Sequence, residues 1–184
     1  MRRPWPRIAP GAYALPWPLF GARAWMRLEI RKAGVSRLSW ARDGGGSAAL
    51  PRAWARRFRA YLAGDLGALA GCPLDLGGLT PFQRRILAAL ARVGPGRRTT
   101  YGALARAAGS PAAARAAGQA MRRNPVPLLL PCHRVGPAGG ALGNYTPGPV
   151  LKRRLLEHEG IHLDPPRART KITGQHARRG HLPA

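Results

Sequence analysis

Hydrophobic and polar residues alternate between residues 25 and 40, which is the pattern of strands with one buried face. Met26, Leu28 and Ile30 fall on one side of this pattern, and charged residues take most of the other side. A Lys-Ala-Gly sequence that ends at Gly34 interrupts the alternation. The segment is therefore predicted to form a β-hairpin.

The hydrophobic residues then change to a helical spacing. In residues 51–62, Trp54, Phe58 and Tyr61 recur three or four positions apart, and a proline opens the segment. This spacing predicts a helix with its aromatic rings on one face. Gly64 follows as a suitable C-terminal cap.

Two stretches show neither the alternation of a strand nor the spacing of a helix. Residues 1–22 are rich in proline, glycine and tryptophan and are predicted to be an irregular extension, while glycines punctuate residues 64–79. We expect a domain boundary in the second stretch, which gives an N-terminal α/β domain with its linker at 23–78 and a C-terminal domain at 79–162. Residues 163–184 carry scattered arginines and adjacent prolines, and are predicted to be a disordered basic tail.

The C-terminal part opens with the clearest helix signal in the chain. Thr80 is suited to cap a helix, Pro81 to occupy its first position and Gln83 to complete a capping box. The hydrophobic residues that follow at helical spacing are Phe82, Ile86, Leu87, Leu90 and Val93. A helix from Pro81 onward is therefore predicted.

Two shorter helices are predicted next, joined by a tight turn. Thr100 caps the first helix, which runs over 101–108, and Gly109 ends it. Ser110 caps the second helix, which begins with a proline and runs over 111–121. This arrangement is typical of a helix-turn-helix, although many helical hairpins never touch DNA.

The second helix of this pair has little capacity to read a DNA sequence. It consists mostly of alanine, with Arg115 as the long basic side chain in its first turns. Alanine cannot form hydrogen bonds to base edges, but it permits close approach to the backbone or the minor groove. The composition favours a protein that scans DNA, and an alanine-rich packing helix is the alternative.

The net charge of the chain also favours binding to DNA. Among 184 residues there are 31 lysines and arginines against 7 aspartates and glutamates, which gives a formal net charge of +24. Residues 25–160 are strongly basic on their own, so the charge is not confined to the two ends. Such a charge favours binding to a phosphate backbone, while a general drift in composition toward arginine is the alternative explanation.

The cysteine content and the hydrophobic runs indicate the cellular setting. Cys72 and Cys132 are the two cysteines, and neither belongs to a pair with zinc-ligand spacing. No hydrophobic run approaches the roughly 20 residues of a membrane span. We therefore expect a soluble, cytoplasmic protein in a reducing environment, with no membrane contact.

Cys132 is the strongest candidate for chemistry. It lies between Pro131 and His133, and Arg134 follows. An imidazole and basic side chains next to a thiol favour the thiolate, which is the form that attacks carbon. A buried structural cysteine beside an incidental histidine is the alternative.

The surroundings of this cysteine closely resemble a known family. The run NPVPLLLPCHRV at 124–135 is followed by Gly-Asn-Tyr at 143–145, and then by Lys152, Leu155 and Glu159 at matching spacing. Together they resemble the O6-alkylguanine-DNA alkyltransferases, also called methylated-DNA–protein-cysteine methyltransferases. The resemblance implies an α/β fold with a small ribonuclease H-like N-terminal domain, followed by a mostly helical, winged helix-turn-helix-like domain.

The resemblance also implies a reaction. In this family an alkyl group moves irreversibly from O6-alkylguanine in duplex DNA to one cysteine, which is Cys132 here. His133, a bridging water and Glu159 are implied as the relay that deprotonates the thiol. Tyr101 is implied as the proton donor to the departing guanine, and Asn124 as the hinge of the active-site loop.

The position of Glu159 supports its place in this relay independently. Its spacing from the leucines of its own helix turns it toward the apolar side, where a carboxylate usually has a partner.

The same resemblance assigns the contacts with DNA. The target nucleotide must be flipped out of the duplex, which costs roughly a few kcal/mol. Arg115 matches the arginine that fills the vacated place in the stack. The other expected DNA contacts are Thr100, Ala114 and Arg122. The pocket for the flipped guanine is expected to be lined by Val135, Tyr145, Thr146 and Lys152.

No metal ion or organic cofactor is implied. Some relatives hold a structural zinc through N-terminal cysteines and histidines, but this chain has only Cys72 and no histidine before His133. The expected partner is double-stranded DNA that contains O6-alkylguanine, bound by a monomer. Cooperativity on DNA and repair of O4-alkylthymine are left open. Pro147 stands where several relatives have glycine or a bulky residue, and a stiffer loop is expected to change the tolerance for large adducts.

Two other functions remain open from the sequence. Non-catalytic alkyltransferase-like proteins recognise alkylated bases, but they carry another residue, often tryptophan, at the position of Cys132. An ordinary helix-turn-helix regulator would need a helix able to read base edges, which the alanine-rich helix lacks.

Overall fold

A computed structural model describes residues 4–20, 24–43, 47–146 and 148–163 of the chain. Within these residues, the N-terminal part is a mixed sheet with strand order β3-β2-β1-β4. Its strands are β1 (Gly11–Pro16), β2 (Trp25–Arg31), β3 (Gly34–Ala41) and β4 (Ala48–Ala49). Strands β2 and β3 form the predicted antiparallel hairpin, and the hydrophobic side of its alternation is buried.

Strand β1 corrects the prediction that residues 1–22 are irregular. It pairs antiparallel with β2 over its whole length. Only Ala14 and Leu15 of this strand are buried, so its sequence shows no clear period of two. The strand forms because β2 offers a complementary edge, a tertiary partner that local propensity does not reveal.

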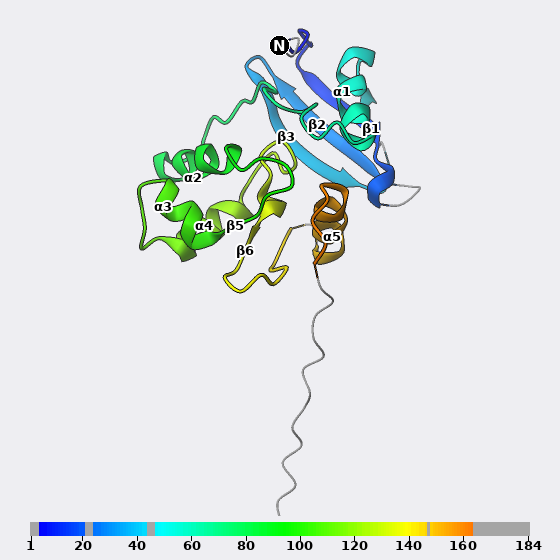
Figure 1. The fold of residues 1–184 in the computed structure, drawn as a ribbon. Helices are drawn as coiled ribbons and strands as arrows, with labels where there is room; N and C mark the ends of the chain where they lie inside the picture. Colours follow the sequence, from blue (N-terminus) through cyan, green and yellow to red (C-terminus); the bar gives the residue numbers. More distant parts are fainter. Residues whose placement is uncertain (1–3, 21–23, 44–46, 147, 164–184) are drawn as a thin grey trace, which may run out of the picture.

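Helix α1 (Arg52–Leu62) packs on this sheet, as Figure 1 shows. Its buried aromatic residues are the predicted Trp54, Phe58 and Tyr61. The segment before β1 lies against the same helix, since the indole N–H of Trp54 donates to the carbonyl of Pro6 at 2.9 Å. The aromatic face therefore joins the sheet, the helix and the start of the chain in one core.

Helix α2 (Pro81–Ala91) begins with the predicted capping box. The hydroxyl of Thr80 accepts a hydrogen bond from the backbone N–H of Gln83 at 3.2 Å, and the side chain of Gln83 accepts one from the N–H of Thr80 at 2.9 Å. Two N–H groups that the first turn leaves unpaired are thereby satisfied. The apolar face of α2 is buried at Ile86, Leu87 and Leu90.

Helices α3 (Tyr101–Ala107) and α4 (Ala114–Arg122) form the helix-turn-helix pair. Thr100 caps α3 as predicted, because its hydroxyl accepts from the N–H of Ala103 at 3.1 Å. Helix α4 begins later than predicted, and the side chain of Ser110 does not cap it. The N–H of Ser110 instead donates to a carbonyl of α3, so this residue closes the first helix rather than opening the second.

The remaining elements complete both parts of the chain. They are η1 (Pro18–Phe20) after β1, then η2 (Cys132–Arg134), the parallel pair β5 (Thr99–Thr100) and β6 (Val135–Gly136), and α5 (Pro149–His158). Figure 1 shows α2, α3 and α4 grouped on one side of the molecule and α5 below the N-terminal sheet. The sheet touches the loop between α4 and Cys132 directly, since the N–H of Leu38 in β3 donates to the carbonyl of Pro125 at 2.8 Å.

The predicted linker at 64–79 is a series of turns that follows the sheet. The N–H of Val35 donates to the carbonyl of Pro73, and the N–H of Asp75 donates back to the carbonyl of Val35, both at 2.9 Å. Pro147 and residues 164–184 lie outside the described residues, so the predictions for them stay predictions. No helix in the described ranges is long and apolar enough to cross a membrane.

Candidate active site

A pocket of about 530 Å³ opens at Cys132, between the helix-turn-helix pair and the loop that precedes α5. The residues of this pocket that the sequence singled out are Tyr101, Arg115, Arg122, Cys132, Tyr145 and Thr146. A second hollow of about 580 Å³, between β3 and the loop at Asn124, also includes Cys132. The thiol therefore lies where the helix-turn-helix pair meets the interior of the protein.

Asn124 connects the end of α4 to this thiol. Its side-chain N–H group donates to the carbonyl of Leu130 at 2.8 Å and to the Sγ atom of Cys132 at 3.2 Å. Its side-chain oxygen accepts from the N–H of Val126 at 3.1 Å. One asparagine thus fixes both the loop and the sulfur, a geometry that suits a hinge.

The ionisation of Cys132 depends on two opposing effects. Burial raises the pKa of the thiol above its ordinary value, while the hydrogen bond from Asn124 and the positive charge of Lys152 lower it. Arg134 does not contribute in the way the sequence suggested, because its guanidinium binds a carboxylate instead of facing the thiol. The buried thiol therefore needs a base to remove its proton.

His133 follows the thiol in the chain and is fully buried. Its Nε2 atom lies 3.0 Å from Oε1 of Glu159. A carboxylate at this distance makes Nε2 the protonated nitrogen of the neutral ring, which leaves Nδ1 as the basic one. Nδ1 is buried and has no hydrogen-bond partner in the described part of the chain. Burial lowers the pKa of His133 despite the hydrogen bond to Glu159, so the ring is a neutral base.

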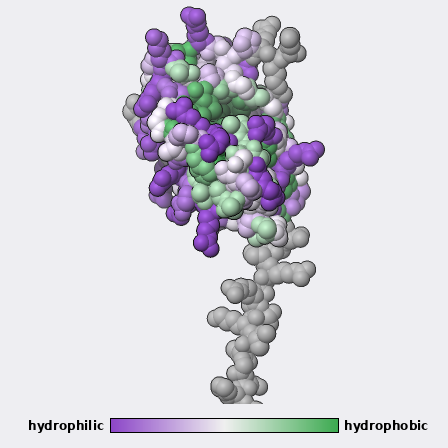
Figure 2. Space-filling model, turned by 90° about the vertical axis from the view of Figure 1, so that its left-hand side faces the viewer, coloured by the Kyte–Doolittle hydropathy of each residue, from purple (hydrophilic) through white to green (hydrophobic). Residues whose placement is uncertain are grey.

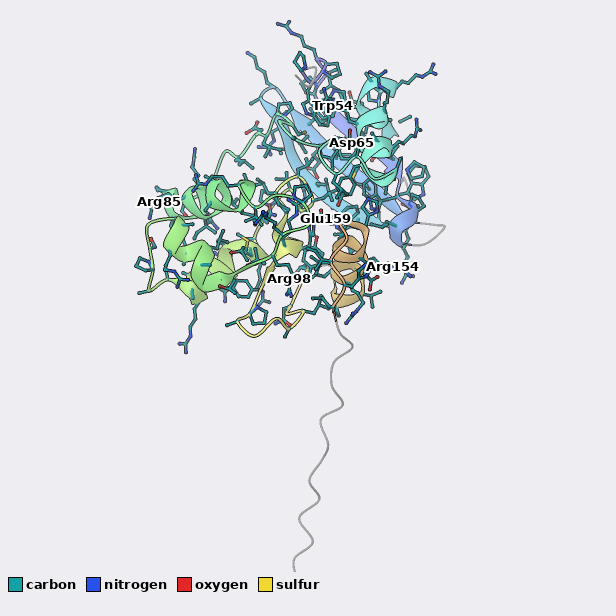
Figure 3. All side chains as sticks on the ribbon, viewed as in Figure 1. Trp54, Asp65, Arg85, Arg98, Arg154 and Glu159 are labelled. Atoms are coloured by element: carbon teal, nitrogen blue, oxygen red, sulfur yellow. The ribbon has the colours of Figure 1, made fainter. Side chains whose placement is uncertain are left out.

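Glu159 is buried, and it has the partners that its place on the apolar side of a helix predicted. Burial alone would raise the pKa of this carboxyl, but hydrogen bonds from His133 and Arg134 and their charges hold it at about 2. In Figure 3 the labelled Glu159 lies near the centre of the molecule, beside α5. It is therefore ionised throughout the neutral pH range.

Two partners of Glu159 were not singled out in the sequence as site residues. Arg134 donates from Nε to Oε2 and from Nη2 to Oε1, both at 2.7 Å, and a further N–H bonds the carbonyl of Val93. The hydroxyl of Tyr61 in α1 donates to Oε1 at 2.8 Å. Arg134 belongs to the motif that carries the family resemblance, whereas Tyr61 was visible only as an aromatic residue on the buried face of a helix.

Lys152 is fully buried and holds the loops around the pocket. Its ammonium group donates to the carbonyl of Val135 at 2.6 Å and to the carbonyl of Asn144 at 3.3 Å. Burial and the nearby charge of Arg98 lower its pKa to about 8. This lysine thus ties β6 to the loop that carries Tyr145.

The predicted DNA-contacting residues lie on α3 and α4 or at their ends. Arg115 is exposed in the first turn of α4 and lines the pocket. Ala114 begins this helix, Arg122 ends it, and Thr100 precedes α3. Figure 2, which faces this side of the molecule, shows hydrophilic side chains around a more hydrophobic centre. The exposed Arg115 and Arg122 on this face suit close contact with a polyanion.

Comparison with known proteins identifies the family. The model of the 6-O-methylguanine DNA methyltransferase DNA-binding domain matches residues 81–161. A methylated-DNA–protein-cysteine methyltransferase of Shigella flexneri is 38% identical over 152 residues, which cover 82% of this chain and 84% of the relative. The chain belongs to the methylated-DNA–protein-cysteine methyltransferase family. A relative of the same description from Methanothermobacter thermautotrophicus is 48% identical over 92 residues, 51% of its length.

The structural comparison extends this family likeness to the N-terminal part. A crystal structure of Mycobacterium tuberculosis OGT in complex with DNA superposes with a TM-score of 0.69 at 33% identity, and the match covers 80% of this chain and 91% of that one. The α/β fold class and the family resemblance inferred from the sequence are thereby confirmed.

Proposed function

We propose that this member of the methylated-DNA–protein-cysteine methyltransferase family repairs O6-alkylguanine in DNA by transferring the alkyl group to Sγ of Cys132. The observation that carries the proposal is the burial of Cys132 at a pocket shared with Tyr101 and Arg115, with the His133–Glu159 pair adjoining it. No other described residue combines a nucleophilic atom, a neighbouring base and an opening toward the helix-turn-helix pair.

The thiol loses its proton to the histidine. Nδ1 of His133 is the free basic nitrogen, and a bridging water carries the proton to it from Cys132. The carboxylate of Glu159 then stabilises the imidazolium that forms, as an acid residue does in a nucleophile–histidine–acid triad. The hydrogen bond from Asn124 and the charge of Lys152 stabilise the thiolate.

The transfer breaks one bond and forms another. The electron pair of the thiolate forms the S–C bond, and the C–O6 bond breaks with its electrons moving to the guanine. The guanine anion must then be protonated or hydrogen-bonded. Tyr101, which lines the pocket, supplies this proton, and burial raises the pKa of its hydroxyl so that it is protonated before the reaction. The thioether product is permanent, so each molecule acts once.

The DNA must deliver a flipped nucleotide to the pocket. Arg115 occupies the first turn of α4 among small residues, so nothing beside it obstructs insertion into the base stack. Thr100, Ala114 and Arg122 lie at the ends of the two helices, where they contact the phosphate backbone on either side of the flipped base.

Of the four residues predicted for the base pocket, two line it and two support it indirectly. Tyr145 and Thr146 line it directly, and burial strongly raises the pKa of the Tyr145 hydroxyl, which faces the thiol of Cys132. Val135 and Lys152 act through the hydrogen bond that joins them, because it fixes the backbone on which the guanine rests.

The test uses a DNA duplex that contains a single O6-methylguanine. After mixing with the protein, the peptide that carries Cys132 is expected to gain one methyl group per molecule, and the Cys132→Ser variant is expected to gain none. Tight binding of the damaged duplex without any mass change would instead support the non-catalytic alkyltransferase-like function. A footprint on one defined sequence without damage would support a regulator.

A further inference from the structure

The N-terminal part of the chain reaches the reaction site through Tyr61. The hydroxyl of this residue donates to Oε1 of Glu159 at 2.8 Å, across 98 positions of sequence. Only 1% of the tyrosine is exposed to solvent. The bond is therefore shielded from water, and a phenol with a short hydrogen bond to a buried carboxylate has a larger electrostatic effect than one at the surface.

The oxygen that Tyr61 contacts is the one that faces the histidine. Oε1 of Glu159 lies 3.0 Å from Nε2 of His133, 2.7 Å from Nη2 of Arg134 and 2.8 Å from the phenol oxygen. Each donor stabilises negative charge on this oxygen, so each lowers the affinity of the carboxylate for a shared proton. Tyr61 and His133 thus compete for the same electron density.

We propose that Tyr61 is a positioning residue of the alkyl-transfer site, which orients the Glu159 carboxylate toward His133 and limits the basicity of the pair. This inference rests on the proposed function, because it concerns the same proton relay. Helix α1, which packs on the N-terminal sheet, would thus help to prepare Cys132 for reaction.

The hydroxyl of Tyr61 keeps its proton and therefore remains a hydrogen-bond donor. Burial raises the pKa of Tyr61 far above its ordinary value, and the neighbouring charge of Glu159 raises it further. The tyrosine is also fixed in place from α5, where Nε2 of His158 lies 2.7 Å from its carbonyl oxygen and the two rings are 5.0 Å apart. Its hydroxyl proton therefore stays on the tyrosine and points at the carboxylate.

The other charged and titratable groups around the pair come from three further elements. They are Arg134 and Cys132 in η2, Lys152 and His158 in α5, and Tyr145 in the loop before α5. A change at Tyr61 leaves these groups in place, so a shift in the pH dependence of the reaction would report on the phenol.

The test is the pH profile of methyl transfer to Cys132 from a duplex with O6-methylguanine, compared between the unchanged protein and Tyr61→Phe. Without the phenol, Glu159 is more basic and His133 holds its proton to a higher pH. The acid side of the rate profile is then expected to move upward by about half a pH unit. A ring-fluorinated tyrosine at position 61 keeps the ring and the bond but donates more strongly, so it should move the acid side downward.

Tyr13→Phe is the matched control, because it removes a tyrosine hydroxyl of the same domain whose hydrogen bond within the described residues goes to the nearby carbonyl of Ala9, at 3.0 Å. It is expected to leave the profile unchanged. A profile of Tyr61→Phe or of the fluorinated protein that coincides with that of the unchanged protein would overturn the inference, even if thermal stability falls. If the unchanged protein transfers no methyl group at all, the proposed function fails instead.

Discussion

One buried carboxylate organises the reaction site at the scale of single residues. Glu159 accepts hydrogen bonds from the histidine beside the nucleophile, from Arg134 in the same turn and from Tyr61 in the N-terminal part. A buried charge persists only when such partners compensate its loss of hydration. The relay is therefore as sensitive to the partners of Glu159 as to Glu159 itself.

Removal of Arg134 is expected to destabilise the fold severely. Arg134→Gln replaces the two-point ionic bond to the buried Glu159 with at most one neutral donor, so that neutral groups alone, with His133 and Tyr61, remain to compensate the charge. A loss of about 3–5 kcal/mol in the free energy of unfolding is expected. Arg37→Gln is the matched control, since its pair with Glu29 is exposed and 4.0 Å long and contributes less than about 1 kcal/mol. Urea unfolding at neutral pH measures both, and equal losses would contradict the prediction.

Asn124 is expected to set the reactivity of the thiol. Asn124→Ala removes the amide donor from Sγ of Cys132, which raises the pKa of the thiol further above its ordinary value. The midpoint for alkylation of Cys132 by iodoacetamide should then move to higher pH. Cys72 is an internal control in the same digest, because no bond to Asn124 affects it and burial raises its pKa to about 12. An unchanged midpoint for Cys132 would mean that the Asn124 amide does not lower the pKa of the thiol.

At the scale of elements, the sequence predicts the start of a helix best where a capping box is followed by hydrophobic residues at helical spacing. Helix α2 begins where Thr80 and Gln83 placed it, because both partners of the capping box are local. Helix α4 begins later than Ser110 suggested, because the backbone of Ser110 is already engaged by the end of α3. A good cap residue therefore predicts a helix start only when its side chain reaches the N–H groups of the turn that follows it.

This difference gives a paired stability test. Thr80→Ala removes a cap that the structure contains, so the free energy of unfolding should fall by about 1 kcal/mol. Ser110→Ala removes a hydroxyl that caps no helix, so a change within about 0.5 kcal/mol is expected. Urea denaturation of the two variants under one condition compares them. A larger loss for Ser110→Ala would mean that the start of α4 is misassigned.

Other features could not be predicted because they depend on partners outside their own segment. Strand β1 has only two buried residues, and β2 supplies the hydrogen bonds that make it a strand. The helical spacing correctly placed Tyr61 on the buried face of its helix. Its hydrogen bond to Glu159 joins residues 98 positions apart, so no local sequence pattern predicts it. The chemistry of Cys132 and His133 was readable because a contiguous motif carries it, whereas the support from the N-terminal part depends on the folded structure.

At the scale of the whole molecule, the buried relay couples stability to pH. The folded-state pKa of Glu159 is about 2, below its ordinary value of 4.5, so its contribution is present above pH 4.5 and is lost as the pH falls toward 2. The pKa of His133 is lowered from 6.5, so acidification below this value also favours the unfolded chain. The free energy of unfolding should therefore fall steadily from about pH 6.5 downward. In Glu159→Gln the decline between pH 4.5 and 2 should be flatter in a series of urea titrations, and an equally steep decline would assign acid sensitivity elsewhere.

The basic surface raises the question of which arginine does more than attract phosphates. With a formal charge of +24, the molecule has many side chains that strengthen DNA binding without taking part in base flipping. If Arg115 fills the gap left by the flipped base, Arg115→Ala should slow methyl transfer from a duplex far more than from a single strand, in which no stack has to be filled. Arg106→Ala, an exposed arginine in the last turn of α3, is the matched control and should lower both rates by the same factor. If Arg115→Ala also lowers the rates from the duplex and from the single strand by the same factor, Arg115 is one phosphate contact among many. Base flipping would then depend on the shape of the alanine-rich surface rather than on an inserted side chain.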